Sequence, residues 1–208
     1  MISFVITVCN EHSELKRLLT QLSKNILSED EVIVQMDEDN VTQEVIDVVN
    51  SFKDKFKLKQ YTYIKFSLNK DFATFKNNPK LQCNKEWIFY IDADEYLSDG
   101  LIDNIHELLE INKGIVDVIA VPRINTVDGL TREHIDKWRW FVDEDGYVNY
   151  PDYQTRICSN KSPIHWINKV HERLSGYQTM ANLPYGYDLI HPKTVERQER
   201  QNNFYSSL

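Results

Sequence analysis

The chain has 208 residues, 41% of them hydrophobic and 27% charged, which is the composition of an ordinary globular protein with one core. Its net charge of −8 argues against binding to nucleic-acid backbones, and no apolar run reaches the ~20 residues that span a bilayer. The opening residues lack the basic leader of a secretory signal, and the three cysteines form no CxxC pair. We therefore expect a protein without a transmembrane segment in the reducing cytoplasm.

The first 121 residues alternate between strand-like and helix-like segments. Short apolar, β-branched runs predict strands, and apolar residues three or four positions apart predict helices. The expected strands cover 2–8, 31–36, 58–66, 87–91 and 116–121, the last one ended by Pro122. The expected helices cover 11–26, 41–52, 71–83 and 97–109, with Ser98 or Asp99 as the cap of the last one. This alternation predicts an α/β fold with a mostly parallel central sheet flanked by helices.

Beyond residue 122 the pattern weakens. Aromatic residues lie there among short strands and turns, and the polar tail over 194–205 is expected to be helical. The sequence contains no internal repeat and no Pro/Gly/Ser-rich linker. A single domain over residues 1–208 is the expected organisation.

Polar residues follow three of the predicted strands. They occupy Thr7–Glu11, Asp37–Asn40 and Asp92–Glu95. Ligands of open α/β sheets bind at the carboxyl ends of the strands, so we expect these stretches to meet at one edge.

The acidic end of WIFYIDADEYL, residues 87–97, is the most informative of the three stretches. In an extended chain Asp92 and Asp94 point to the same side, so both carboxylates can face one ligand. Carboxylate oxygens suit Mg²⁺ or Mn²⁺, which leave positions open for phosphate oxygens. The alternative is an acidic turn that caps the following helix.

The segment IDADE resembles the DxD signature of family 2 glycosyltransferases with the GT-A fold. VITVCNE resembles the first strand and nucleotide loop of that family, and EVIVQMDEDN resembles its second strand. LNKDFATFKNN followed by EWIFYIDADE is similar to its bacterial sugar-transferase branch. The resemblance is good over residues 1–123 and looser beyond. It implies a nucleotide-sugar-binding half, 1–123, and a half, 124–208, that completes the metal and acceptor sites.

The resemblance also implies roles for individual residues. Thr7, Asn10 and Asp37 would contact the nucleoside, Asp92 would lie near the ribose or the metal, and Asp94 would bind the metal directly. The remaining expected donor contacts are Glu11, Asp71, Lys76, Asn77 and Ala93. The chain departs from the family at Val8 and Cys9, where Pro and an aromatic residue are frequent. It also has Lys76 in place of an arginine, so a bidentate phosphate contact becomes a point charge.

The second half offers a base and a further metal ligand. Glu172 in HWINKVHERL is the candidate base, because related sugar transferases have similar segments there, and Asp152 is the alternative. His191 is the candidate that completes the metal shell. Three basic residues after it could approach a diphosphate: Lys193, Arg197 and Arg200. Three tryptophans could stack on an acceptor sugar, with Trp166 favoured over Trp138 and Trp140.

The expected activity is transfer of a hexose from a UDP-sugar to a hydroxyl of a glycan or lipid-linked acceptor. The resemblance implies Mn²⁺ or Mg²⁺ as cofactor and inversion at the anomeric carbon. One alternative is a haloacid-dehalogenase-like phosphatase, since FYIDADEYL partly fits its DxDx[TV] motif. Tyr96 and the three strand–helix units before the motif oppose that alternative. The other is a non-catalytic module that binds a sugar nucleotide or a glycan.

Overall fold

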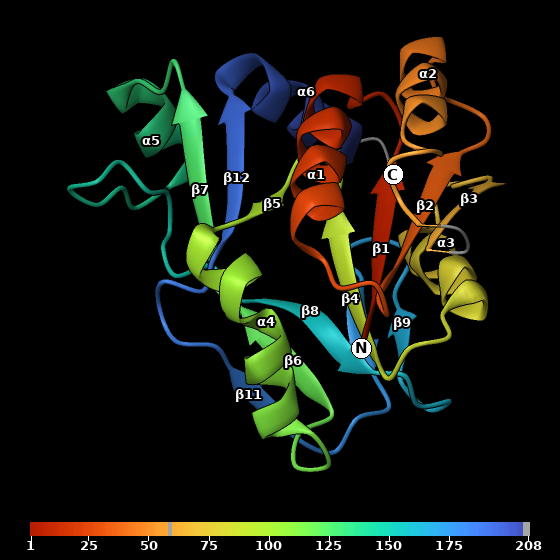
Figure 1. Cartoon of the computed structure of the whole chain (residues 1–208). Coiled ribbons are helices and arrows are strands. Elements are labelled where there is room, and N and C mark those ends of the chain that lie inside the picture. The colour runs from red at the N-terminus through yellow and green to blue at the C-terminus, as the bar shows by residue number, and fades with distance from the viewer. Residues whose placement is uncertain (58–59, 206–208) are drawn as a thin grey trace.

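The structure of the chain is a computed structural model that describes residues 1–57 and 60–205 (Figure 1). Its centre is a seven-stranded sheet with the order β11-β6-β8-β4-β1-β2-β3. The strands are β1 (Ile2–Val8), β2 (Glu31–Asp37), β3 (Tyr61–Phe66), β4 (Trp87–Asp92), β6 (Val118–Val121), β8 (Gln154–Ser159) and β11 (Met180–Asn182). β3, β2, β1 and β4 pair in parallel, as predicted, while β8 runs antiparallel between β4 and β6.

Both faces of the sheet are covered, which explains why apolar residues predominate in β1, β2 and β4. On one face Phe4 and Ile6 pack against α1 (His12–Asn25), α2 (Gln43–Ser51) and α4 (Asp99–Asn112). The other face, with Val5, packs against α3 (Phe72–Asn77) and the hairpin of β9 (His165–Ile167) and β10 (Arg173–Ser175). These elements hold the ends of β1, β2 and β4 in place.

A smaller sheet extends the molecule on the side of the β4 end. It has the order β5-β12-β7, with β5 (Tyr96–Leu97), β7 (Arg123–Asp128) and β12 (Leu189–Thr194). β7 and β12 pair in parallel, with His191 opposite Asn125. Helices α5 (Arg132–Trp138) and α6 (Val195–Tyr205) follow β7 and β12, and α6 lies at the end of the molecule to which β1, β2 and β4 point (Figure 1).

The expected elements are confirmed, with differences at their ends. The helix expected over 71–83 is the α-helix α3 up to Asn77 and then a 3₁₀ helix, η1 (Asn78–Gln82), because Pro79 has no amide hydrogen to continue the α-helical pattern. Leu97 belongs to β5, and α4 begins after Ser98, whose hydroxyl accepts from the Leu101 amide as the predicted cap. Beyond Pro122 the chain re-enters a strand at once. Residues 58–59 of the third expected strand lie outside the described residues.

No described helix is both long and apolar enough to cross a lipid bilayer.

Candidate active site

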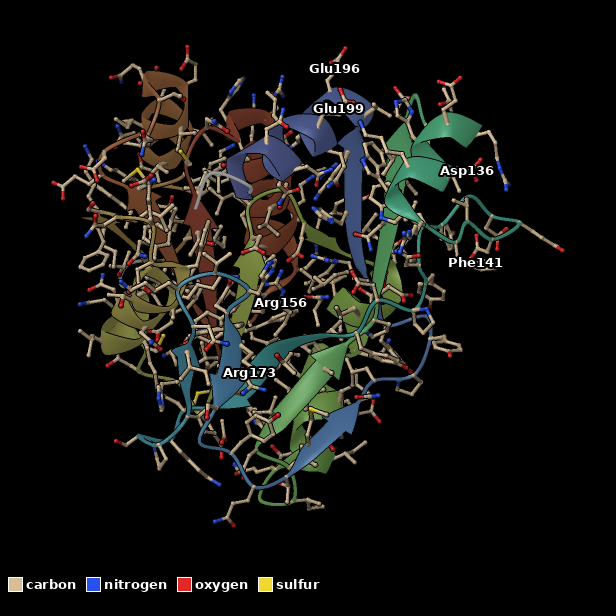
Figure 2. The ribbon with its side chains drawn as sticks, turned by 180° about the vertical axis from the view of Figure 1, so that it is seen from behind. Asp136, Phe141, Arg156, Arg173, Glu196 and Glu199 are labelled. Carbon is tan, nitrogen blue, oxygen red and sulfur yellow. The ribbon has the colours of Figure 1, made fainter. Side chains whose placement is uncertain are left out.

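A cavity of about 790 Å³ opens at the carboxyl ends of β1, β2 and β4. The three polar stretches predicted from the sequence meet there and contribute the whole of Thr7–Glu11, Asp37 with Asn40, and Asp92–Asp94. The opposite wall comes from β12 and α6 with His191, Lys193, Arg197 and Arg200. Figure 2 shows Arg156 in the interior beneath α6, whereas Glu196 and Glu199 lie on the outer side of that helix.

Many basic side chains line the cavity, although the chain as a whole is acidic. Six basic residues line it: Lys76, Arg123, Arg156, Lys193, Arg197 and Arg200. Five carboxylates also line it: Glu11, Asp37, Asp92, Asp94 and Glu172. The lining thus has one basic residue more than it has carboxylates, in a chain with a net charge of −8. Such a cavity suits an anionic ligand.

Asp92, the last residue of β4, is held by three donors. Its Oδ1 accepts from the Thr7 hydroxyl and the Lys76 ammonium, each at 3.2 Å, and its Oδ2 accepts from Arg156. Burial alone raises the pKa of this carboxyl, but the charges of Arg156 and Lys76 outweigh it and hold the pKa well below the ordinary value. Asp92 is therefore ionised and fixed.

Asp94 faces the opposite wall of the cavity. Its Oδ2 lies 3.1 Å from His191 Nε2 and 3.2 Å from Arg197 Nη2. Burial raises the pKa of Asp94, but the hydrogen bond with His191 and the charges of His191 and Arg197 lower it below the usual range. The sequence placed Asp94 and His191 in one site, and the structure brings the two side chains together across 97 positions of the chain.

The donor set at Asp94 fits a divalent cation. A carboxylate oxygen and an imidazole nitrogen suit Mn²⁺, and Mg²⁺ and Mn²⁺ take further oxygens from phosphates. Across the described residues 1–57 and 60–205, no group of three or more His, Cys, Asp and Glu side chains is arranged to hold a metal. Asp92, which we expected as a further ligand, is instead bound to Lys76 and Arg156. The protein thus offers two ligands.

Lys76 joins the strand end to the candidate base. Its ammonium is 2.8 Å from Glu172 Oε1, and its side chain is only 6% exposed. It lies 4.9 Å from the ring centre of Trp166, a cation–π contact. Trp166 itself is 4% exposed and packs edge-on against Tyr90. It therefore forms part of the cavity wall, and its contact with an acceptor sugar stays a prediction.

Glu11 and Asp37 shape the loops of the cavity. Glu11 Oε2 accepts from the amides of Cys9 at 2.9 Å and Asn10 at 3.0 Å. Asp37 is buried and accepts from the Asn40 side chain at 2.8 Å and the Leu68 amide at 3.1 Å. Burial, together with these two carboxylates, raises the pKa of the Cys9 thiol to about 11. Cys9 is therefore an unreactive thiol at neutral pH.

Three expected donor contacts have structural tasks. Asp71 caps α3 by accepting from the Thr74 amide, and the Asn77 side chain exchanges two hydrogen bonds of 2.8 Å with the Trp166 backbone. Neither is among the described residues that line the cavity. Ala93 lines it, and its amide donates to the Thr7 carbonyl, which ties the two strand ends together.

Sequence reasoning missed the buried ion cluster beneath the cavity. Glu95 is fully buried and accepts from Arg123 at 2.9 Å and Arg156 at 2.7 Å, while its other oxygen accepts from the Asp92 amide. Arg123 also binds Asp152. The available signal was Arg156 inside the strand QTRICS, because a buried charge requires a partner.

The fold is of the α/β class, with a mostly parallel central sheet and a cavity at the carboxyl ends of its strands. A model of the family described as "Glycosyl transferase family 2" matches residues 3–164, and the chain belongs to this family. No curated protein sequence is significantly similar to the chain.

Solved structures of S. aureus TarS share the fold. TarS 1–349 in complex with UDP-GlcNAc has a TM-score of 0.65 and 14% identity, covering 92% of this chain and 58% of that one. TarS 1–349 in complex with UDP has a TM-score of 0.65 and 13% identity, covering 92% and 60%. This chain thus spans about three-fifths of the length of those proteins. At this identity the likeness establishes the fold, and it confirms the predicted GT-A architecture.

Proposed function

We propose that the chain is a metal-dependent glycosyltransferase that moves a hexose from a UDP-sugar to an acceptor hydroxyl with inversion. The observation that carries the proposal is the pairing of Asp94 with His191 in a cavity lined by six basic residues. The family and the position of the cavity at the strand ends support it.

The basic residues suit a nucleoside diphosphate. Lys193, Arg197 and Arg200 come from β12 and α6, and Lys76 and Arg156 lie at the strand ends, so basic side chains from separate parts of the chain line the cavity that would hold a diphosphate. Burial lowers the pKa of Lys193, and a phosphate beside it would favour its charged form. The structure of TarS with UDP, on the same fold, supports uridine as the nucleoside.

Asp94 and His191 are the residues that would hold the metal. A divalent cation there would stabilise the negative charge that develops on the departing diphosphate. Two protein ligands leave room for phosphate oxygens, which is the usual way in which Mg²⁺ joins a protein and a nucleotide. Beside this position, Asp92 forms ion pairs with Lys76 and Arg156.

Glu172 is the proposed base. Inversion requires a carboxylate that takes the proton of the acceptor hydroxyl as its oxygen attacks the sugar. Glu172 lines the cavity, its side chain is 18% exposed, and Lys76 holds it at 2.8 Å. Asp152, the alternative, is not among the described lining residues, and Arg123, Asn125 and Gln154 already donate to it. We propose a hydroxyl of a glycan or of a lipid-linked saccharide as the acceptor.

The phosphatase alternative has less support. Its first aspartate acts as a nucleophile, and here that residue is Asp92, whose two oxygens accept from Thr7, Lys76 and Arg156. The family match also opposes it.

Ligand binding to the purified chain tests the proposal. With UDP-sugar at ~100 times its Kd, binding adds about 2.7 kcal/mol to the free energy of unfolding. At this chain length the melting temperature should rise by roughly 5 to 10 °C, provided that Mn²⁺ is present. Asp94→Asn should lose the Mn²⁺-dependent part of the rise, whereas Asp99→Asn, at an exposed position in the first turn of α4, should retain it.

Turnover separates an enzyme from a binding module. We expect release of UDP from one UDP-sugar in a panel, faster with Mn²⁺ and abolished in Asp94→Asn. Binding without release from any sugar nucleotide, with a range of saccharide acceptors, would favour the non-catalytic module. A folded protein with no response to any nucleotide would contradict the proposed site.

A further inference from the structure

A chain of hydrogen bonds runs from Arg123 to His191. Arg123 donates to Asp152 Oδ2 from Nε at 2.9 Å and from Nη2 at 2.6 Å. Asn125 Nδ2 donates to the same oxygen at 2.9 Å, and Asn125 Oδ1 lies 2.7 Å from His191 Nδ1. Asn125 and His191 are neighbours in the register of β7 and β12.

The chemistry of Asp152 determines which way the Asn125 amide points. Burial raises the pKa of Asp152, but the charge of Arg123 and the bonds from Asn125 and Arg123 lower it, so this side chain is an ionised carboxylate. An ionised carboxylate only accepts hydrogen bonds. The Asn125 amide must therefore turn its NH₂ group to Asp152 and its oxygen to His191.

This orientation in turn selects the tautomer of His191. An amide oxygen facing Nδ1 requires a proton on Nδ1, which leaves Nε2 of the neutral imidazole with its lone pair. That lone pair faces Asp94 Oδ2 at 3.1 Å. His191 is 4% exposed, so its ring has little room to turn away. Two acceptors facing each other attract only when a proton or a metal cation lies between them: the imidazolium form of His191 donates to Asp94 from Nε2, whereas the neutral ring needs a metal cation there.

We infer that Asn125, held by Asp152 and Arg123, is a positioning residue that presents His191 Nε2 to a divalent cation shared with Asp94. The inference rests on the proposed function for the identity of the site. In this role Asn125, Asp152 and Arg123 act through His191 and do not contact the sugar or the nucleotide. Partners of this kind orient metal-binding histidines, and their loss commonly weakens metal affinity 10- to 100-fold.

A role limited to holding the strands together explains less. β7 and β12 are already paired through their backbones over six successive positions from Leu189 to Thr194. Their pairing does not require the side chain of Asn125. The pairing of β7 with β12 also does not require the orientation of the Asn125 amide that leaves His191 Nε2 without a proton.

The tautomer can be measured without metal or substrate. In protein with ¹⁵N-labelled histidine, at a pH where the imidazole is neutral, the protonated and bare ring nitrogens have well separated ¹⁵N shifts. His191→Gln assigns the signal. We expect His191 to be protonated on Nδ1, which is the minor form of free histidine in water. Protonation on Nε2 would overturn the inference.

Variants then test the cause. Asn125→Leu keeps the branched shape of the side chain and has no acceptor, so it should lose the Nδ1–H preference and weaken Mn²⁺ binding in the presence of UDP by about 10- to 100-fold. The matched control is Asn104→Leu on α4, where the asparagine bonds only to its own helix, and it should behave as the unaltered protein.

Unchanged tautomer and Mn²⁺ affinity in folded Asn125→Leu would overturn the inference. If that variant does not fold, Asp152→Ala tests the same step, because it releases the Asn125 amide and should mix the two tautomers. If the unaltered protein does not bind Mn²⁺ with UDP, the proposed function is contradicted. The tautomer of His191 would still show whether Asn125 directs its oxygen to Nδ1.

Discussion

Lys76 shows how a single side chain can serve two carboxylates with different tasks. Its ammonium is 3.2 Å from Asp92, on the floor of the cavity, and 2.8 Å from Glu172, the proposed base. The resemblance to the family predicts an arginine at this position, whose planar fork favours one bidentate partner. An ammonium is a compact charge that can lie between two carboxylates. The departure from the family pattern thus fits the arrangement of this site.

Replacing Glu172 by Gln removes the proposed proton acceptor and keeps the shape of the side chain. We expect kcat to fall by about 10²- to 10⁴-fold, the range typical of general-base catalysis. The Kd for the UDP-sugar should change little, because the other cavity residues remain. Steady-state kinetics and calorimetry measure the two quantities.

Glu107→Gln, at an exposed position of α4, is the matched control and should retain full activity. A Glu172→Gln variant with undiminished kcat would remove Glu172 from the mechanism. Asp152→Asn would then be the next variant to measure.

Residues of the site could be predicted from the sequence only where a pattern among neighbouring residues marks them. Asp92 and Asp94 were visible because two carboxylates directly follow an apolar strand. Glu95 is adjacent to them, yet its task depends on Arg156, 61 positions away, and on Arg123. No local signal pairs such distant residues. The same reason hid Asn125, whose importance appears only when β7 and β12 lie side by side.

At the scale of elements, regular periodicity decided which segments could be predicted. α1 and α4 each bury four residues at helical spacing, and both were expected. α5 buries none of Arg132–Trp138, so it has no apolar stripe to reveal it. The position of β8 between β4 and β6 could not be predicted, because strand order is decided by three-dimensional pairing and not by the sequence of one strand.

Asp117 anchors the edge of the sheet. It precedes β6, and its carboxylate accepts from Lys161 at 2.7 Å and from the amides of Gln178 and Thr179, which directly precede β11. The hydrogen bond from Lys161 and those two amide bonds lower the pKa of Asp117 to about 2. Because the pKa is lower in the folded state, this stabilisation is complete above the ordinary value near 4 and is lost as the pH falls through about 2.

The Asp117→Asn variant should therefore lose part of the acid sensitivity. Between about pH 4 and 2, unfolding of the unaltered protein should take up as much as one proton more than unfolding of the variant. Denaturant unfolding at a series of pH values measures that difference. Equal slopes for the two proteins would show that Asp117 has an ordinary pKa, and NMR titration of its carboxyl is an independent check.

At the scale of the whole molecule, α6 joins parts of the chain that are far apart in sequence. Arg197 binds Glu11 in the first loop, Glu14 on α1 and Asp94 at the strand end. On its other side, Glu199 pairs with Lys137 of α5 at 3.7 Å. None of the described side chains over 195–203 is buried, so α6 lies on the surface while it supplies Arg197 and Arg200 to the cavity.

A variant that ends at Thr194 separates stability from binding. It loses the half-buried ion pairs of Arg197 and the exposed pair of Glu199 with Lys137, but no buried side chain of residues 195–203, so it should remain folded with a fall in melting temperature. It also loses two arginines from the cavity. A charge-assisted hydrogen bond contributes about 1.5–3 kcal/mol, so the loss of one phosphate contact alone should raise the Kd for UDP roughly tenfold or more.

Calorimetry without metal is the decisive measurement for this variant, because Arg197 also contacts Asp94 and its removal could ease metal binding there. Lys137→Ala is the control, because it removes the ion pair between α5 and α6 and leaves the cavity residues in place. The Kd of this variant for UDP should equal that of the unaltered protein. If the shortened protein binds UDP with unchanged affinity, α6 does not contact the diphosphate. The cations of the floor, Lys76 and Arg156, would then have to bind it alone, although Asp92 and Glu172 already engage Lys76, and Asp92 and Glu95 engage Arg156.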